Sequence, residues 1–132
     1  MKKINLLLCF FLVFQTIGWA QNKIAYQLFT KEGKKTTYKK LLKEAAAADV
    51  VLFGEYHDNS VVHWLQLELT KDLAEKMKLV LGAEMLEADN QKQLNQYLRG
   101  EITQKQFDST ARLWKNYKTD YKPLVYFAKE KN

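Results

Sequence analysis

Cysteine is almost absent from this chain, since Cys9 is the only one among 132 residues. It lies in an apolar N-terminal run that we expect to be removed, so the mature chain would have none. A chain without cysteine excludes a disulfide, a thiolate nucleophile and a Cys-ligated metal. Any metal would have to be bound by His, Glu, Asp or Tyr side chains. Repeats, low-complexity tracts and linkers are also lacking, and the length suits one small domain at most.

The first twenty residues have the features of a secretory signal peptide. Lys2 and Lys3 are followed by an apolar run over residues 4–14, and Gly18 and Ala20 are the small residues expected before a cleavage site. We therefore expect residues 1–20 to be a signal peptide cut after Ala20, and the protein to be periplasmic or membrane-associated. The run is too short to span a membrane comfortably, and an uncleaved anchor is the alternative. No small residues precede Cys9 as a lipoprotein cleavage site requires, which argues against lipidation.

The charge is basic but dispersed. Losing Lys2 and Lys3 with the leader lowers the net charge from +6 to +4. The remaining lysines are scattered along the chain and are not interleaved with aromatic residues in a nucleic-acid-binding motif. We expect solvated surfaces and no nucleic-acid partner.

Two apolar segments with a helix between them organise the centre of the chain. Residues 49–53 and 79–84 have the composition of buried strands, and an apolar stripe repeats every fourth residue in the predicted helix over about 61–78. A strand, a helix and a strand within about 35 residues indicate a βαβ unit with parallel strands. A short strand over 24–30, a turn at Gly33 and a helix over 38–48 come before it.

The rest of the chain has a helical pattern. One predicted helix starts at Asp89 or Asn90 and ends at Gly100, the next is capped by Thr103, and the last covers 124–129 with Pro123 in its first turn. The predicted fold class is α/β, a parallel-rich sheet with helices packed on it. Because two parallel strands bury too little surface for a robust domain, we expect residues 21–132 to be the N-terminal part of a larger domain.

Acidic and imidazole groups follow both predicted strands. Gly54, Glu55, Tyr56 and His57 follow the first, and Glu84 ends the second. Glu55 and His57 are two residues apart, so their side chains point to the same side of an extended segment. Adjacent strands would place Glu84 roughly 5 Å from Glu55, at the carboxyl edge where α/β sheets bind ligands. Two carboxylates and an imidazole at one edge could bind a cation. Alternatively, they could hold one proton between them, which would raise the pKa of one of these groups.

Simpler roles remain open for each of these residues. Glu55 could cap the following helix and His57 could hydrogen-bond a loop carbonyl. Tyr56 could be a ligand to ferric iron or could simply pack. His63 suits the surface or a supporting position behind the site. The polar segment 117–123 could close over the sheet edge or only connect two helices.

Several short motifs, in this order and spacing, resemble the ChaN-like proteins of the haem-binding-uptake and Tiki superfamily. The motif after the first strand, Gly-Glu-x-His-Asp, is fairly specific, and the ordered set over residues 24–132 is more so. The segments that carry the resemblance are 52–59, 82–87, 98–103, 114–117 and 121–124.

The resemblance implies an exported haem-binding or iron-binding protein that takes part in uptake, a binding protein rather than an enzyme. The resemblance implies haem as the ligand, with Glu55, Tyr56, His57 and Glu84 as the residues that bind it. It also implies that two subunits pair around haem and that the protein associates with a membrane or an uptake system. Tiki-type members imply an alternative, a metal-dependent hydrolase with Glu55, His57 and Glu84 as metal ligands. The family's later Gly-x-x-His motif has no counterpart here.

Overall fold

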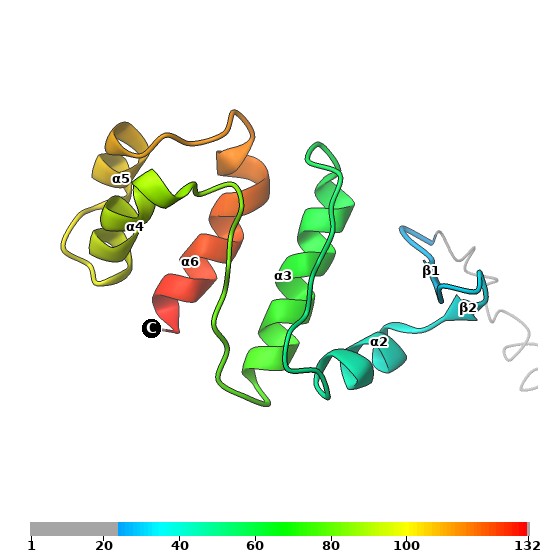
Figure 1. Cartoon of the computed structure of the whole chain (residues 1–132). Helices are drawn as coiled ribbons and strands as arrows, with labels where there is room; N and C mark the ends of the chain where they lie inside the picture. The colour runs from blue at the N-terminus through cyan, green and yellow to red at the C-terminus, as the bar shows by residue number, and fades with distance from the viewer. Residues whose placement is uncertain (1–23, 132) are drawn as a thin grey trace, which may run out of the picture.

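The computed structural model describes residues 24–131, so the predicted signal peptide lies outside the described residues. The described part is mostly helical (Figure 1). A short antiparallel hairpin comes first, in which β1 (Leu28–Phe29) pairs with β2 (Lys35–Thr36). Its turn contains Gly33 at φ 75°, a left-handed conformation that glycine adopts without strain.

Capping residues define the starts of the first two helices. Thr37 accepts a hydrogen bond from the backbone N–H of Lys40 and starts α2 (Tyr38–Ala45). Asn59 accepts from the N–H groups of Val61 and Val62 and starts α3 (Ser60–Ala74). These side chains satisfy donors that have no partner within the helix. The buried stripe of α3 contains Leu65, Leu69 and Leu73, as its periodicity predicts.

The second half contains three short helices. A 3₁₀ turn (Ala88–Asn90) leads into α4 (Gln91–Leu98), which ends before Gly100 at φ 73°. Next is α5 (Gln104–Thr110), where Thr103 and Gln106 form a reciprocal capping box. A π-helical turn (Tyr117–Tyr121) then runs directly into α6 (Lys122–Glu130), with Pro123 in the first turn as predicted.

Two apolar clusters form the core. One lies between α2 and α3, where Ala45, Leu69 and Leu73 are covered by Phe53 and Leu79. The other joins the C-terminal helices to the residues after the second extended segment. Its buried members are Met85, Leu86, Tyr97, Phe107, Tyr117, Tyr121 and Val125.

The predicted parallel sheet is not formed in residues 24–131. The only sheet there is the β1–β2 hairpin, and residues 50–55 and 79–82 are extended without a strand ladder. Both extended segments run in the same direction past the helices in Figure 1, and both line one groove. The direction of the predicted βαβ unit is therefore present, but its hydrogen bonds are not.

The physical reason is visible in the exposure of these segments. Phe53 and Leu79 pack inward, whereas Leu52 is 92% exposed and Val80 is 97% exposed. No backbone hydrogen bond involves residues 50–55 or 79–82 within the described part of the chain. A strand of a parallel sheet needs partners at its edge and cover on both faces, and here only one face is covered.

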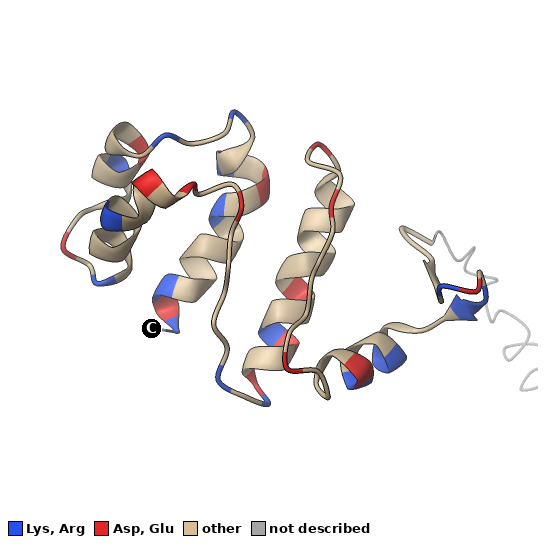
Figure 2. Cartoon of the chain, in the orientation of Figure 1, with Lys and Arg blue, Asp and Glu red and all other residues tan. Residues whose placement is uncertain are grey.

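No helix among the described residues is long and apolar enough to cross a membrane. Basic and acidic residues are both spread over the helices and loops in Figure 2, and α2 has three lysines (Lys39, Lys40 and Lys43) against one acidic residue, Glu44.

Candidate functional site

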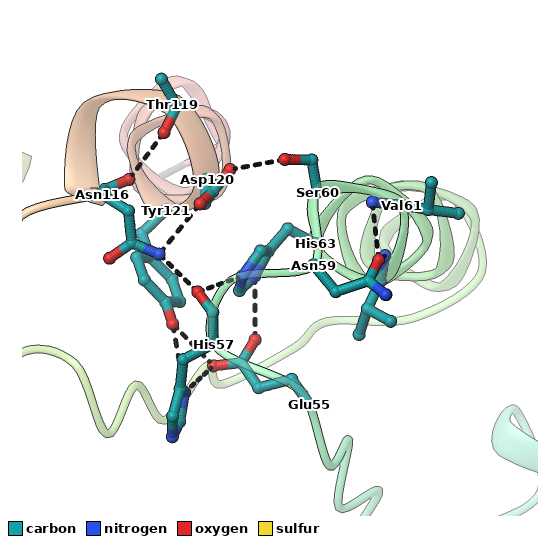
Figure 3. Close-up of polar contacts among 11 residues, drawn as sticks. Glu55, His57, Asn59, Ser60, Val61, His63, Asn116, Thr119, Asp120 and Tyr121 are labelled. Atoms are coloured by element: carbon teal, nitrogen blue, oxygen red, sulfur yellow. Dashed lines mark hydrogen bonds and ion pairs between the residues drawn. The ribbon is translucent and has the colours of Figure 1, made fainter.

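Glu55 lies at the centre of a polar cluster beyond the first extended segment (Figure 3). Its Oε1 accepts a hydrogen bond from the Tyr121 hydroxyl at 3.1 Å and lies 3.4 Å from Nδ1 of His57. Its Oε2 lies 2.9 Å from Nδ1 of His63. The last two atoms are at ion-pair distance without an aligned hydrogen bond, so their attraction is electrostatic and requires a protonated imidazole. Glu55 therefore connects two histidines and a tyrosine.

His63 is the buried support of this cluster. It comes from the first turn of α3, and its side chain is only 2% exposed. Its Nε2 lies 3.2 Å from the backbone carbonyl of His57, and because a carbonyl only accepts, this nitrogen donates. Its ring also packs edge-to-face on Tyr121, with 4.6 Å between centroids. Of the two roles predicted for His63, the structure therefore shows the supporting one.

The segment from Asn116 to Tyr121 closes against the same turn. The side-chain amide of Asn116 donates to the carbonyl of His57 and, at 2.9 Å, to Asp120. Ser60 at the start of α3 donates to the other carboxylate oxygen of Asp120 at 3.3 Å. The contact of Asn116 with His57 and that of Ser60 with Asp120 join residues about sixty positions apart. Two roles were predicted for this polar segment, closing over the site or only connecting two helices. In the structure the polar segment packs over the end of the first extended segment.

Tyr121 remains a neutral phenol over the physiological range. Burial, together with its hydrogen bond to the Glu55 carboxylate, raises the pKa of Tyr121 to about 12. A neutral hydroxyl has one proton, which it donates to Glu55, so its oxygen can only accept from Nδ1 of His57 at 3.3 Å. The pairing thus places the proton of His57 on Nδ1.

That tautomer leaves Nε2 of His57 with a free lone pair. This nitrogen makes no hydrogen bond with a described residue, and the side chain is 54% exposed. Figure 3 shows this end of the ring pointing away from the cluster. Trp114 packs on the ring in an edge-to-face arrangement, with 4.9 Å between centroids and an angle of 89°. The imidazole is therefore held on one side and open on the other.

A groove of about 930 Å³ runs between the two extended segments and α3. Most of its lining is apolar, and its polar side chains include Glu55, His57 and Glu84. Ligand sites in proteins usually enclose about 300–1,000 Å³ and are apolar with a few placed polar groups. A smaller depression of about 440 Å³ lies between the hairpin and α2, away from the cluster.

The other two predicted site residues do not take part in the cluster. Tyr56 is 76% exposed and its hydroxyl has no hydrogen bond to a described residue. Glu84 is exposed, lines the same groove and makes no ion pair with a described residue. In residues 24–131, no group of three or more His, Cys, Asp or Glu side chains is arranged to hold a metal ion. The metal set Glu55, His57 and Glu84 thus stays a prediction.

Sequence reasoning missed the contribution of Tyr121. The polar composition of segment 117–123 pointed to a role for this loop, but no spacing rule identifies which tyrosine turns inward. A five-residue π-helical turn sets that direction. The position of His63 was easier to infer from the sequence. A helix N-cap at Asn59 places His63, the fourth residue after it, in the first turn of the helix and next to the chain turn that precedes it.

A family model described as "Haem-binding uptake, Tiki superfamily, ChaN" matches residues 41–132. This chain belongs to that family. The match begins within α2 and includes the whole polar cluster and both extended segments, which confirms the resemblance noted in the sequence. No curated protein and no solved structure matches this chain.

Proposed function

We propose that this protein is an exported haem-binding or iron-binding protein that acts in haem or iron uptake. The single observation that carries the proposal is His57, an imidazole held at Nδ1 and free at Nε2 at the edge of an apolar groove. Membership of the haem-binding-uptake family supports a haem-related role. The residues proposed to contact the ligand are Glu55, Tyr56, His57 and Glu84.

The side chains around the groove suit a porphyrin. A haem presents a large apolar face, an iron that takes nitrogen or oxygen ligands, and anionic propionates. Leu52 and Val80 provide exposed apolar surface at the groove, and His57 provides a nitrogen lone pair beside it. When bound, haem would supply the iron chemistry. The chain's own residues would bind it, orient the imidazole and exclude water from the apolar face.

The proposal also includes the route out of the cell. Residues 1–20 have the pattern of a signal peptide, and cleavage after Ala20 would release a mature chain into the periplasm, where it could associate with a membrane or an uptake system. N-terminal sequencing of the secreted protein would test the cleavage site.

Pairing of two subunits around haem belongs to the same proposal, and light scattering with and without hemin would test it.

A hemin titration followed by absorbance tests the binding function. We expect a Soret band that saturates at a fixed stoichiometry in the wild-type protein. An unrelated protein of similar net charge is the control, because hemin adsorbs to basic surfaces. Hemin binding no stronger than to that control would refute the proposed function.

A metal-dependent hydrolase is the second candidate, favoured by the pairing of Glu55 with His57 at 3.4 Å. A carboxylate beside an imidazole can hold a metal or activate water. This candidate requires a stoichiometric divalent metal in elemental analysis and peptidase activity that a chelator abolishes. A protein purified without bound metal, and unable to bind one on addition, would rule it out.

A further inference from the structure

We propose that the N-terminal hairpin and α2 form a surface that docks on an anionic lipid bilayer. This inference rests on the membrane association named in the proposed function, and it depends on no property of the haem groove. A mature chain without residues 1–20 lacks their apolar run, so its contact with a membrane would come from its folded surface. The docking surface consists of Phe29 and the six exposed lysines of residues 24–48, which are Lys31, Lys34, Lys35, Lys39, Lys40 and Lys43.

The net positive charge of the mature chain is concentrated in this part of the molecule. Residues 24–48 contain six lysines and two glutamates, so their net charge is +4. Residues 49–131 contain twelve basic and thirteen acidic residues, which gives a net charge of −1. Figure 2 shows the basic segments of β2 and α2 at the end of the molecule that lies away from α4 and α5. A net charge that looks dispersed in the sequence is therefore gathered at one end of the fold.

The lysines of α2 face solvent because the other side of this helix is packed. Leu41 and Leu42 pack against the apolar cluster shared with α3, and the hydroxyl of Tyr38 donates to Asp72 of α3 at 2.7 Å. Residues one and four positions apart share the outer arc of a helix of this kind. That arc has three exposed lysines, which are Lys39, Lys40 and Lys43. The charges are therefore held on a fixed surface.

An exposed phenylalanine lies among the lysines. Phe29, at the end of β1, is 55% exposed. It is the cross-strand partner of Lys35, so these two side chains lie on the same face of the hairpin. Phe29 also lines the depression between the hairpin and α2, together with Lys31 and Lys40. An aromatic ring placed in this way can enter the apolar edge of a bilayer while the ammonium groups around it reach the lipid phosphates.

Aromatic residues continue from the hairpin onto α3. The ring of Tyr26, just before β1, packs on Trp64 with 5.8 Å between centroids. Trp64 is 48% exposed, and Ile24 beside Tyr26 in the chain is 69% exposed. Trp and Tyr are the residues that are enriched where a bilayer meets water. The docking surface is therefore flanked by side chains that suit the same boundary.

The kind of cation favours a lipid surface over other polyanions. All the basic residues of the docking surface are lysines, and both arginines of the chain, Arg99 and Arg112, lie elsewhere. Nucleic-acid phosphates and protein carboxylates are matched best by the planar fork of arginine. A bilayer attracts lysines through its diffuse surface potential, and each lysine near the surface strengthens binding about fivefold. Lys31 and Lys40 have glutamates at 3.7 and 3.8 Å, and the other four lysines make no ion pair within residues 24–131.

Co-sedimentation of the secreted protein, with residues 1–20 removed, with lipid vesicles tests the proposal. We expect binding to phosphatidylcholine vesicles that contain about 30% phosphatidylglycerol to be at least about tenfold tighter than binding to phosphatidylcholine alone. Added salt should weaken this binding, because it screens the attraction. Equal binding to the two kinds of vesicle, or binding to neither, would overturn the proposal.

Two pairs of substitutions with the same change in charge locate the surface. Lys35→Gln with Lys40→Gln removes two lysines beside Phe29, whereas Lys105→Gln with Lys118→Gln removes two exposed lysines of the C-terminal half. The first pair should weaken vesicle binding about 25-fold, and the second about twofold at most. All four lysines are exposed, so the circular dichroism spectrum should not change. Equal effects of the two pairs would refute the assignment to the hairpin and α2.

Phe29→Ser separates insertion into lipid from attraction to any polyanion. It should weaken vesicle binding about tenfold although the net charge is unchanged, because it removes the apolar contact. If Phe29→Ser has no effect where the loss of Lys35 and Lys40 does, the lipid proposal is overturned. It is also overturned if duplex DNA binds the wild type as tightly as the anionic vesicles do.

Hemin titrations keep this inference separate from the haem function. The variant with Lys35→Gln and Lys40→Gln should bind hemin like the wild type, because neither lysine lines the groove. Wild-type protein that binds anionic vesicles but not hemin would refute the haem function and support the docking surface. Wild-type protein that binds hemin but not the vesicles would refute the docking surface alone.

Discussion

Replacing Tyr121 with Phe should destabilise the protein through one hydroxyl. The phenol donates to the Glu55 carboxylate at 3.1 Å in a fully buried position. Hydrogen bonds to charged groups contribute about 1.5–3 kcal/mol to stability. Phenylalanine keeps the ring and hence the edge contacts with His63 and Trp114, whose centroids lie at 4.6 and 5.7 Å. The expected loss in the free energy of unfolding is therefore about 1.5–3 kcal/mol, with no contribution from a cavity.

Tyr117 provides a control at the other end of the same turn. Its hydroxyl is buried without a hydrogen-bond partner among the described residues. Removing a hydroxyl that has no partner relieves a desolvation cost, so Tyr117→Phe should be neutral or stabilising. The two variants have the same change in composition and comparable burial, which isolates the hydrogen bond.

Urea denaturation followed by circular dichroism measures both variants. We expect a lower midpoint for Tyr121→Phe with an unchanged m-value, because the surface exposed on unfolding is the same. Equal midpoints for Tyr121→Phe and Tyr117→Phe would refute the claim that Glu55 and Tyr121 stabilise each other.

Three further predictions concern the same elements. Because the pKa of Tyr121 is raised to about 12, the stability that the neutral Tyr121 phenol contributes should be complete below pH 10 and lost between pH 10 and 12. An absorbance titration of Tyr121→Phe should show one late-ionising phenol fewer than that of the wild type. Amides of residues 50–55 and 79–82 should exchange with solvent much faster than those of α3, because they have no backbone acceptor; slow exchange would show that they are paired. Asn59→Ala should lower the free energy of unfolding by about 0.5–2 kcal/mol, measured by thermal denaturation. It should also weaken hemin binding, because the cap fixes the helix turn that carries His63. Ser109→Ala, at the end of α5, should leave hemin binding unchanged.

The helices could be predicted because their signals are local. Asn59, Thr103 and Pro123 each specify a helix start through a hydrogen bond or a fixed φ within a few residues, and all three positions are confirmed. The stripe of Leu65, Leu69 and Leu73 likewise predicts its own buried face. The predicted ends of α2 and α3 were three or four residues too long, because the last turn of a helix depends on packing beyond it.

The sheet could not be settled in the same way. The segments that contain Leu52 and Val80 have the composition of buried strands. Whether two strands pair, however, depends on partners distant in sequence, and local composition does not describe those partners. The candidate site shows the same division. Glu55 and His57 were identified from their position after an apolar segment, whereas Tyr121 reaches them across 64 residues or more through a turn that no motif marks.

The most direct test of haem binding at this groove is the effect of bound hemin on the amide signals of the ¹⁵N-labelled protein. Ferric iron broadens signals near it. We predict that hemin removes the signals of residues 50–57 and 79–84 and leaves those of α5 (Gln104–Thr110) intact, because α5 lies away from the groove. Broadening that follows exposed lysines, or that spares residues 54–57, would contradict the site described above.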